Sequence, residues 1–486
     1  MRKHKIIVLI IFLISVSVMV NAQEETETPP DPDEAGCPEL VTMALEQTET
    51  ECEDTGLNEA CYGNSSMDAQ PRPGLPEFTF SQPGHKIDLI DIESLRLSTM
   101  DVAIDQWGVT MLYVEGRQAD RASDDDGVEL GEDAVQYVLF GDVEIGESTT
   151  FLGVTALEAL AIRSRPTTDS DPLAELADGV SIVANGRLED STWVRVRLPG
   201  DNSNIGWIKA EFVVPDGDGD LEELAAIPFE VANTEEPGER ATYGPMQIFS
   251  FQSGQDDAPC AEAPNSGILI QTPEGAASIS IWMDEVVITM DATAFVQVEP
   301  GGDMTISILE GSAQVEADGV SRTIIPGTQV TVPIDDNLVA VGQPSAPEAF
   351  VMENLDNVPV GLLDEVVTIP QPVNIQPGVP FEGNWLFSWG VQSRTCPDGT
   401  EIPFSSIGTT GTITVQEGGV FWHGVLYTQT TQGVYTATYA DENGNLHRDT
   451  LQVQAGDRIS GEKVIELVNP VCTLNVPFSV QLISSF

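Results

Sequence analysis

Short segments in which apolar and polar residues alternate recur along most of the chain, and Gly, Pro, Asn or Asp residues separate them. Because successive side chains of a β-strand point to opposite faces, a period of two predicts half-buried strands. The pattern is clear in residues 241–334, which include the segments Ile279–Met283 and Thr328–Pro333. Turns that recur about every 8–12 residues are typical of an antiparallel sandwich or roll.

Residues 381–486 show the same alternation and hairpin turns such as Asp441–Asn445. Meander order with short turns predicts a small antiparallel β-barrel. We expect eight strands, which begin near Trp385, Ile402, Thr412, Phe421, Val434, Leu446, Ile459 and Val476.

The N-terminal part differs in one segment. Between Pro38 and Thr50, apolar residues have helical spacing, which predicts a short helix. The rest alternates with period two, and we expect strands at 78–80, 86–92, 107–114 and 135–145.

The predicted fold class is therefore mainly β, with three to four domains. Shifts in composition place the domain boundaries. We expect a signal peptide at 1–22, an acidic spacer at 23–36, an N-terminal β-rich domain with a short helix at 37–150, a second β domain at 151–215, an acidic linker at 216–240, a β roll or sandwich at 241–334, a Pro-rich connector at 335–380, and the C-terminal barrel at 381–486.

The start of the chain resembles an export signal. Basic Arg2, Lys3 and Lys5 precede the apolar run Ile6–Val20, and Val20-Asn21-Ala22 fits a cleavage site after Ala22. The alternative is a membrane anchor, but the run is shorter than the ~20 residues of a spanning helix. We expect a secreted, extracellular or envelope-associated protein with no membrane span after cleavage.

The charge excludes one class of partner. Signal cleavage lowers the number of Lys and Arg from 20 to 17, against 78 Asp and Glu, and changes the net charge from −58 to −61. Binding to nucleic acid requires clustered Lys and Arg that displace counterions. We therefore expect no nucleic-acid partner.

Six cysteines in an exported chain predict disulfides. Cys396 and Cys472 flank the last domain and are expected to pair. We favour Cys52–Cys61 and Cys37–Cys260 for the other four, so that the last bond joins two domains; the alternative is a free, buried Cys260.

Residues 151–215 carry four short motifs in a fixed order: Ile162-Arg163-Ser164 followed by Pro166, then Ala177-Asp178-Gly179, Trp193-Val194-Arg195-Val196 and Gly206-Trp207-Ile208. They resemble the strands and turns of the bacterial SH3-like (SH3b) family. That resemblance implies a small β-barrel in an exported protein that binds cell-wall peptide or polysaccharide. Arg165 stands where the family usually has Gly, so the turn there is expected to differ.

Alternation places Trp193, Arg195 and Arg197 on one face of the central strand. Together with Arg163 they form the candidate ligand site, because guanidinium groups beside an aromatic ring suit carboxylates and sugar faces. The region holds 6 of the 17 basic residues that remain after signal cleavage. The alternative is that Trp193 caps the barrel and that the arginines pair with Glu189 and Asp190.

A weaker resemblance covers residues 267–333. Gly267, Glu310-Gly311-Ser312-Ala313 and Pro326-Gly327-Thr328, set in a series of strands, are similar to the FecR-like β domain. This resemblance implies a scaffold outside the membrane. The layout as a whole resembles uncharacterised multidomain bacterial exported proteins that contain SH3-like domains.

Motifs for metal or catalytic chemistry are weak. Asp216, Asp218 and Asp220 have the spacing that begins a calcium loop, but Leu221 replaces its Gly and Ile227 its bidentate Glu. We therefore interpret the segment as a linker and a weak calcium candidate. No catalytic residues are expected, because no nucleophile–base motif is present. No other metal site or cofactor is expected, because the sequence has no zinc-ligand spacing, Rossmann glycine pattern or P-loop.

We therefore expect a non-catalytic binding or scaffold protein of the bacterial envelope. Its SH3-like module would contact peptidoglycan or a surface polysaccharide, and other envelope proteins are further candidate partners. One alternative is a self-assembling surface or matrix protein. A second is a secreted wall hydrolase whose catalytic domain lies in 37–150 or 381–486.

Overall fold

The computed structural model describes residues 36–72, 78–116, 134–148, 151–198, 201–215, 219–234, 245–254, 260–273, 278–389, 394–397, 399, 401–402, 408–416, 418–469 and 471–485. The predicted signal peptide lies outside these ranges, as does the predicted acidic spacer apart from Gly36. No described helix is both long and apolar enough to cross a bilayer.

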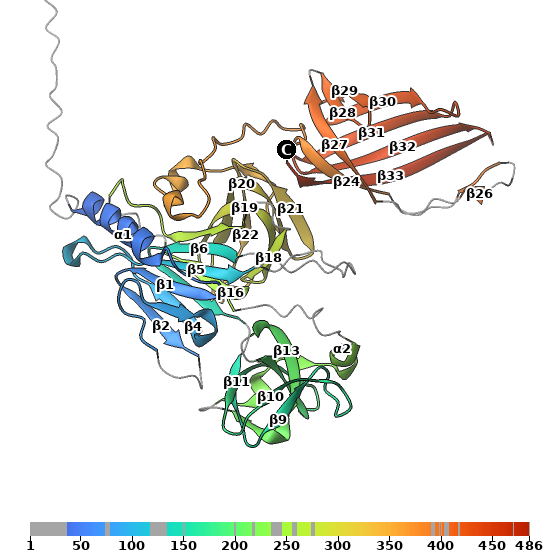
Figure 1. Cartoon of the computed structure of the whole chain (residues 1–486). Helices are drawn as coiled ribbons and strands as arrows, with labels where there is room; N and C mark the ends of the chain where they lie inside the picture. Colours follow the sequence, from blue (N-terminus) through green and yellow to red (C-terminus); the bar gives the residue numbers. More distant parts are fainter. Residues whose placement is uncertain are drawn as a thin grey trace, which may run out of the picture.

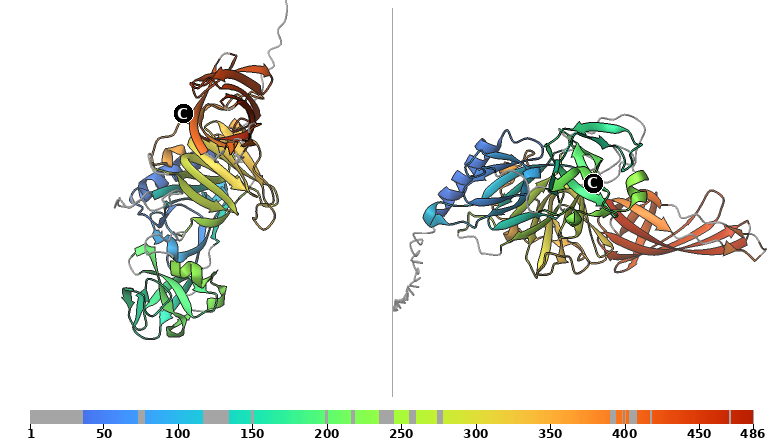
Figure 2. Two further views of the ribbon diagram at one scale, coloured as in Figure 1. Left: turned by 90° about the vertical axis from the view of Figure 1, so that its right-hand side faces the viewer. Right: turned by 90° about the horizontal axis from the view of Figure 1, so that it is seen from below.

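The protein is mainly β, as predicted, and forms a central curled sheet with a smaller domain and a barrel at opposite ends (Figures 1 and 2). The predicted helix is present as α1 (Cys37–Cys52), and a second, short helix is α2 (Phe229–Thr234). The three disulfides indicate an oxidising, extracytoplasmic environment.

The central sheet draws its strands from two separate parts of the chain. The first part supplies β1 (Glu59–Asn64), β2 (Met67–Pro71), β3 (Lys86–Asp88), β4 (Ile92–Leu97), β5 (Val109–Glu115), β6 (Ala134–Phe140) and β7 (Val143–Glu147). The second supplies β16 (Ile248–Ser253), β17 (Gly267–Gln271), β18 (Ile279–Met283), β19 (Val286–Val298), β20 (Asp303–Ala317), β21 (Val320–Ile324), β22 (Thr328–Pro333) and β23 (Glu348–Ala349).

Two strand pairs join these parts. β6 pairs with β17 from Phe140↔Gly267 to Gln136↔Gln271, and β7 pairs with β16. The segments 37–150 and 241–334, which the sequence analysis separated, therefore share one sheet and one core. β17 is buried along its whole length, so it requires cover on both faces and a partner at each edge. Alternation along the chain does not specify which strands meet.

In the N-terminal part, the structure differs from the predicted strands in detail. β1 and β2 were missed, and 3₁₀ helix η1 (Leu89–Asp91) interrupts the expected strand at 86–92. Residues 78–80 form no strand. There Phe80 is buried in edge contact with Tyr62, with ring centroids 5.3 Å apart, so its apolar side chain anchors a loop.

One face of the sheet is covered by α1 and by the segment 350–369. Leu40, Val41 and Ala44 of α1 pack in one cluster with Leu355 and Leu362. The predicted Pro-rich connector is thus partly folded against the sheet. Polar contacts fix it as well, because the side chain of Gln136 bonds to the backbone of both Leu362 and Asp364.

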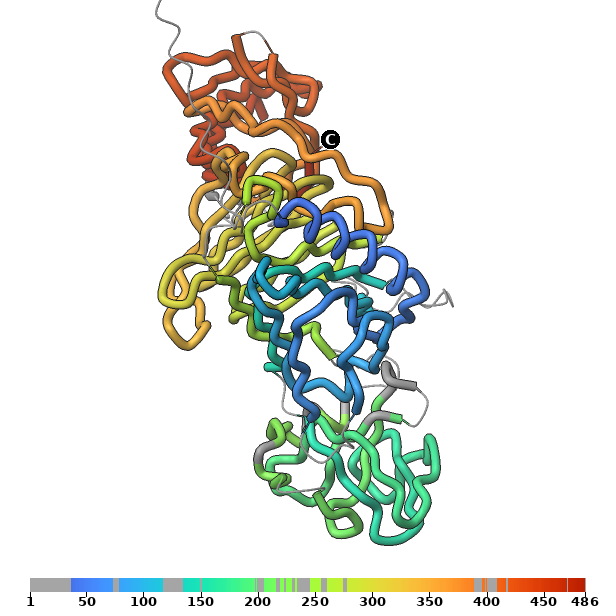
Figure 3. The backbone as a smooth tube through the Cα atoms, turned by 90° about the vertical axis from the view of Figure 1, so that its left-hand side faces the viewer, coloured from blue at the N-terminus to red at the C-terminus, as the bar shows by residue number. Residues whose placement is uncertain are grey.

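A separate antiparallel sheet is inserted between β7 and β16. It contains β8 (Leu152–Ala156), β9 (Leu160–Arg163), β10 (Pro172–Leu176), β11 (Ser181–Leu188), β12 (Trp193–Leu198), β13 (Asp201–Lys209), β14 (Val213–Pro215) and β15 (Ala226–Ile227). We call residues 151–234 the inserted domain; it lies at the opposite side of the central sheet from the barrel (Figure 3).

Buried Arg72 connects both ends of the insertion to the central sheet. Its guanidinium lies 4.5 Å from the ring of Phe151, where the chain enters the domain, and 3.8 Å from Glu147. Glu147 accepts a hydrogen bond from the backbone N–H of Met246, where the chain returns. Removing one partner of such a buried pair is expected to be costly.

The C-terminal domain is a closed antiparallel barrel of eight strands, as predicted. They are β24 (Gly383–Trp389), β27 (Gly408–Gln416), β28 (Gly419–Trp422), β29 (Val425–Thr431), β30 (Val434–Ala440), β31 (Leu446–Ala455), β32 (Arg458–Val468) and β33 (Val471–Ser484).

The identity of one barrel strand differs from the prediction. Ile402 lies in β26 (Glu401–Ile402), which pairs only with β25 (Arg394–Thr395) among the described strands. The eighth barrel strand arises because His423 and Gly424 adopt positive φ and turn the segment after Phe421 into a hairpin. Positive φ is uncommon outside Gly, so a turn at His423 is not predictable from its residue type.

The three disulfides join Cys37 to Cys260, Cys52 to Cys61 and Cys396 to Cys472, which is the pairing that we favoured. Cys37–Cys260 connects α1 to the second part of the central unit. It therefore ties together the two parts that the strand pairs join.

Burial of Asp284 predicts a pH-dependent stability of the central sheet. Asp284 is 4% exposed, and burial raises the pKa of its carboxyl to about 8, although Oδ1 accepts a hydrogen bond from Phe251 N–H. Since the ordinary pKa is 3.8, unfolding releases a proton between about pH 4 and pH 8. The free energy of unfolding should therefore fall with rising pH, by at most about 1.4 kcal/mol per pH unit from this group.

We expect Asp284→Asn to flatten this slope and to stabilise the protein at pH 8, measured by denaturant unfolding from pH 4 to pH 9. Asp318→Asn is the matched control, since Asp318 is exposed and both residues have positive φ, 47° and 51°. Equal slopes for Asp284→Asn and wild type would contradict a buried, protonated Asp284.

Candidate functional site

The predicted site residues Trp193, Arg195 and Arg163 lie on one face of the inserted domain. Antiparallel register places Trp207 of β13 directly between Arg195 of β12 and Arg163 of β9. Trp193 lies on the same face of β12, two residues before Arg195. We call Arg163, Trp193, Arg195 and Trp207 the aromatic face. The side chain of Arg197 lies outside the described part of the structure.

Strand alternation explains this arrangement. Val194, Val196 and Ile208 are fully buried in the core of the inserted domain, so the residues between them point to the other side of the sheet. In the sequence, Trp207 stood out only as part of the motif Gly206-Trp207-Ile208. Trp207 precedes the apolar Ile208 on a predicted strand, and successive side chains of a strand point to opposite faces. This spacing could have placed Trp207 on the same face as Trp193.

The aromatic face is not open to solvent. Trp193 is 8% exposed and Trp207 is fully buried, in a small cluster with Leu188, Ile227 and Ala232. Ile227 belongs to β15, which pairs in parallel with β11, and Ala232 belongs to α2, which Figure 1 shows close to β13. Part of the predicted acidic linker at 216–240 therefore folds over the predicted ligand site.

Glu189 and Asp190 were the partners of the arginines in the alternative interpretation, and the following contacts of the described arginines go to other groups. Arg195 Nε donates to Asn185 Oδ1 at 3.0 Å, and Arg163 Nη1 donates to the carbonyl of Ser170 at 2.7 Å. Arg187 pairs with Glu222 at 2.7 Å.

Asp190 instead accepts hydrogen bonds from the backbone and hydroxyl of Thr192. These bonds lower the pKa of its carboxyl, with the hydroxyl bond the larger cause. Asp190 thus stabilises the turn before β12 and does not neutralise the aromatic face.

One buried donor on this face, Trp207 Nε1, has no hydrogen-bond partner among the described residues. Arg187 Nε is also buried without a partner there, but Arg187 lies opposite Val194 of β12 and Ala226 of β15, on the other side of the sheet. A buried donor without an acceptor costs about 1–3 kcal/mol, and such groups are few in folded proteins. The face therefore has unused capacity for an acceptor-rich group.

Of the three residues of the calcium candidate, only Asp220 lies within the described ranges. Asp216 and Asp218 lie outside the described residues, while exposed Asp220 accepts a hydrogen bond from Glu222 N–H and caps a 3₁₀ turn. No group of three or more His, Cys, Asp and Glu residues in the described ranges is placed to hold a metal ion.

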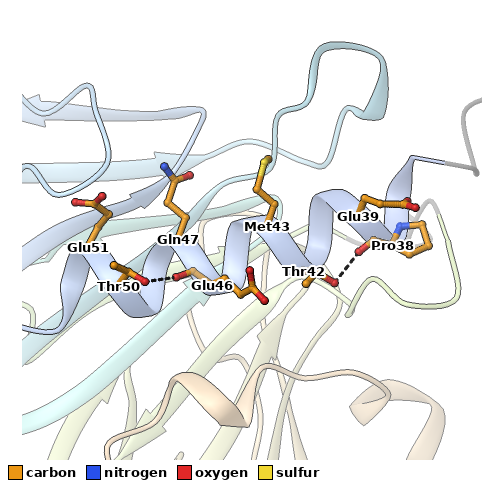
Figure 4. A pocket seen from close by; sticks show the side chains of 8 residues that line it. All are labelled: Pro38, Glu39, Thr42, Met43, Glu46, Gln47, Thr50 and Glu51. Atoms are coloured by element: carbon orange, nitrogen blue, oxygen red, sulfur yellow. Dashed lines mark hydrogen bonds between the residues drawn. The ribbon is translucent and has the colours of Figure 1, made fainter.

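A shallow hollow of about 770 Å³ lies along the outer face of α1 (Figure 4). Every side chain that lines it comes from this one helix, and Thr42 and Thr50 bond back to carbonyls of the preceding turn. A single polar helix face offers no converging groups, so we assign no chemistry to it.

The barrel contains a buried polar cluster. The carboxylate of Asp449 accepts hydrogen bonds from Tyr427 at 2.8 Å and Tyr439 at 3.2 Å, and it pairs with Lys463 at 3.2 Å. Burial is the main cause that raises the pKa of Tyr427 and Tyr439 above its ordinary value. The cluster lies among the aromatic residues of the barrel core and links β29, β30, β31 and β32.

We expect Lys463→Met to destabilise the barrel by about 3 kcal/mol, because it leaves the carboxylate of Asp449 buried without its cation. Arg448→Met is the matched control, since Arg448 and Glu466 form an exposed ion pair on the same two strands. That control should cost less than about 1 kcal/mol. Calorimetry of the barrel transition measures both, and equal losses would contradict a stabilising role for the buried pair.

Comparisons with protein-family models, with curated proteins and with solved structures find no match to this chain.

Proposed function

We propose that this is an exported, non-catalytic binding protein of the bacterial envelope, and that its inserted domain contacts peptidoglycan or a surface polysaccharide. The observation that carries the proposal is the aromatic face, where two tryptophans and two arginines lie on the same side of one sheet. Aromatic rings and guanidinium groups suit sugar faces and peptide carboxylates.

The surroundings of this face support the proposal. The whole chain has a net charge of −58, so an anionic wall is repelled by most of its surface. Arg163 and Arg195, gathered on one face of the inserted domain, offer a local exception. The SH3-like motifs at 162–164, 193–196 and 206–208 lie on strands of this same domain.

The central sheet suits the role of a scaffold. The Cys37–Cys260 disulfide ties the two parts of the central sheet, and the Arg72 contacts fix the inserted domain to that sheet. The inserted domain lies away from the barrel (Figures 2 and 3). A rigid mount of this kind presents a binding domain outward without ordering a linker on binding.

Co-sedimentation of the protein with purified peptidoglycan tests the proposal. We expect saturable binding that Arg163→Ala weakens about tenfold, since a charge-assisted hydrogen bond contributes about 1.5–3 kcal/mol. Arg96→Ala is the matched control, because Arg96 is exposed on β4 of the central sheet and carries the same charge.

Arg96→Ala should bind like wild type at every salt concentration. Equal weakening by both variants would show charge attraction without a site. Failure of wild type to bind at any salt concentration would overturn the proposed function.

A further inference from the structure

We propose that the C-terminal barrel has a binding site of its own, for a neutral saccharide, at the buried cluster around Asp449. This inference goes beyond the proposed function, because it concerns another domain and a ligand without charge. The observation that carries it is a buried carboxylate oxygen, Asp449 Oδ1, which has no hydrogen-bond partner among the described residues.

The cluster lies between the sealed core of the barrel and the end away from the connector. The connector closes the first end, since Phe381 packs in the barrel core and its N–H donates to the carbonyl of Gly456. Asp449, farther along the barrel, is 2% exposed. The inward residues beside and beyond it are Tyr439, His447 and Lys463, and all three are only half-buried. The cluster therefore borders on solvent at this end, where a ligand would enter.

Three donors converge on one oxygen of Asp449. Tyr427, Tyr439 and Lys463 all donate to Oδ2, at 2.8, 3.2 and 3.2 Å. Oδ1 of the same carboxylate is left without a donor. Since an unpaired carboxylate oxygen is unfavourable in a buried position, the cluster has an unused acceptor.

His447 supplies a second unused acceptor. It lies two residues before Asp449 on β31 and stacks on Tyr439, with ring centroids 4.9 Å apart. Its Nε2 lies 3.3 Å from Oδ2 of Asp441. The neutral ring with its proton on Nε2 therefore presents Nδ1 as an acceptor, and Nδ1 is buried without a partner in the described part of the chain. Alternate residues of a strand are about 6.6 Å apart, so one small molecule can reach both acceptors.

The charges of the cluster restrict the ligand. Asp449 and Lys463 form an ion pair at 3.2 Å, so their charges cancel. Burial raises the pKa of the hydroxyls of Tyr427 and Tyr439, which stay neutral. A charged ligand would lie close to a like charge in a poorly solvated site. The site therefore favours a neutral ligand that donates two hydrogen bonds.

Hydroxyl groups meet this requirement. A hydroxyl carries a donor and an acceptor on one atom, whereas an amide N–H is accompanied by a carbonyl oxygen that needs its own donor. A saccharide presents several hydroxyls on a rigid ring, so that two can bond at once with little loss of conformational freedom. We therefore assign the ligand to neutral saccharides.

Isothermal titration calorimetry of the full mature chain tests this site, with the tetramer of N-acetylglucosamine and maltotetraose as probes. The two probes distinguish an N-acetylated glycan from a plain glucan. We expect saturable binding of at least one of them. Binding of neither would overturn the site, with ordered water alone on the two acceptors.

His447→Phe keeps a ring beside Tyr439 and removes the acceptor. It should weaken tetramer binding about tenfold, as for the loss of one hydrogen bond. His85→Phe is the matched control, since His85 is a half-buried histidine of the central unit whose Nδ1 also accepts a hydrogen bond, from Ser81 N–H. The control should bind like wild type, and equal affinities of wild type and His447→Phe would overturn the site.

Asp449→Asn tests the carboxylate and serves as the second variant if His447→Phe impairs folding. The three donors hold the amide oxygen in the place of Oδ2, so an NH₂ group replaces the unused acceptor. We expect tetramer binding to weaken about tenfold here as well. Unchanged affinity would contradict the proposal.

Arg163→Ala separates this site from the one on the inserted domain. Tetramer binding that is weakened by Arg163→Ala and unaffected by His447→Phe would place the saccharide on the inserted domain and overturn the barrel site. Tetramer binding that depends on His447, without any binding to peptidoglycan, would support the barrel site and overturn the proposed function.

Discussion

The pairing of β6 with β17 and of β7 with β16 is the constraint on which the rest of the structure depends. These ladders join strands that lie more than a hundred residues apart in sequence, and they turn two stretches into one sheet. Everything between them is then an insertion with both ends fixed. Cys37–Cys260 crosses the same junction. Arg72 contacts Phe151 at one end of the inserted chain, and its partner Glu147 accepts a hydrogen bond from Met246 at the other.

Basic residues are scarce in this chain, and several are placed at buried junctions. Arg72 pairs with Glu147 beside the inserted domain, and Lys463 pairs with Asp449 inside the barrel. Arg322 lies 3.6 Å from Asp457, where the central unit meets the barrel. Removing either partner of a buried pair leaves an uncompensated charge, so each pair favours one arrangement of the segments that it joins.

The contact between the central unit and the barrel also includes direct hydrogen bonds. Thr323 of β21 donates its hydroxyl to the carbonyl of Leu482 at 2.6 Å, and its N–H donates to Asp457. Phe381, at the end of the connector, packs in the barrel core with Trp385. The connector thus closes one end of the barrel, and the barrel is fixed to the central unit.

The sequence by itself determined the local features. Period-two alternation gave the mainly β class and the barrel, helical spacing gave α1, and cysteine parity favoured the observed disulfides. Alternation also placed Trp193 and Arg195 on one face, because the direction of a strand side chain depends only on its position along the strand.

Only the tertiary structure determined which strands pair and which segments pack on one another. Strand edges carry the same backbone groups in every strand, so the sequence did not reveal that β6 pairs with β17. The covering of Trp207 by Ile227 depends on a segment that looked like an acidic linker, because its few apolar residues have no period. Its fold is determined by the surface on which it packs, and that surface exists only once the inserted domain has formed.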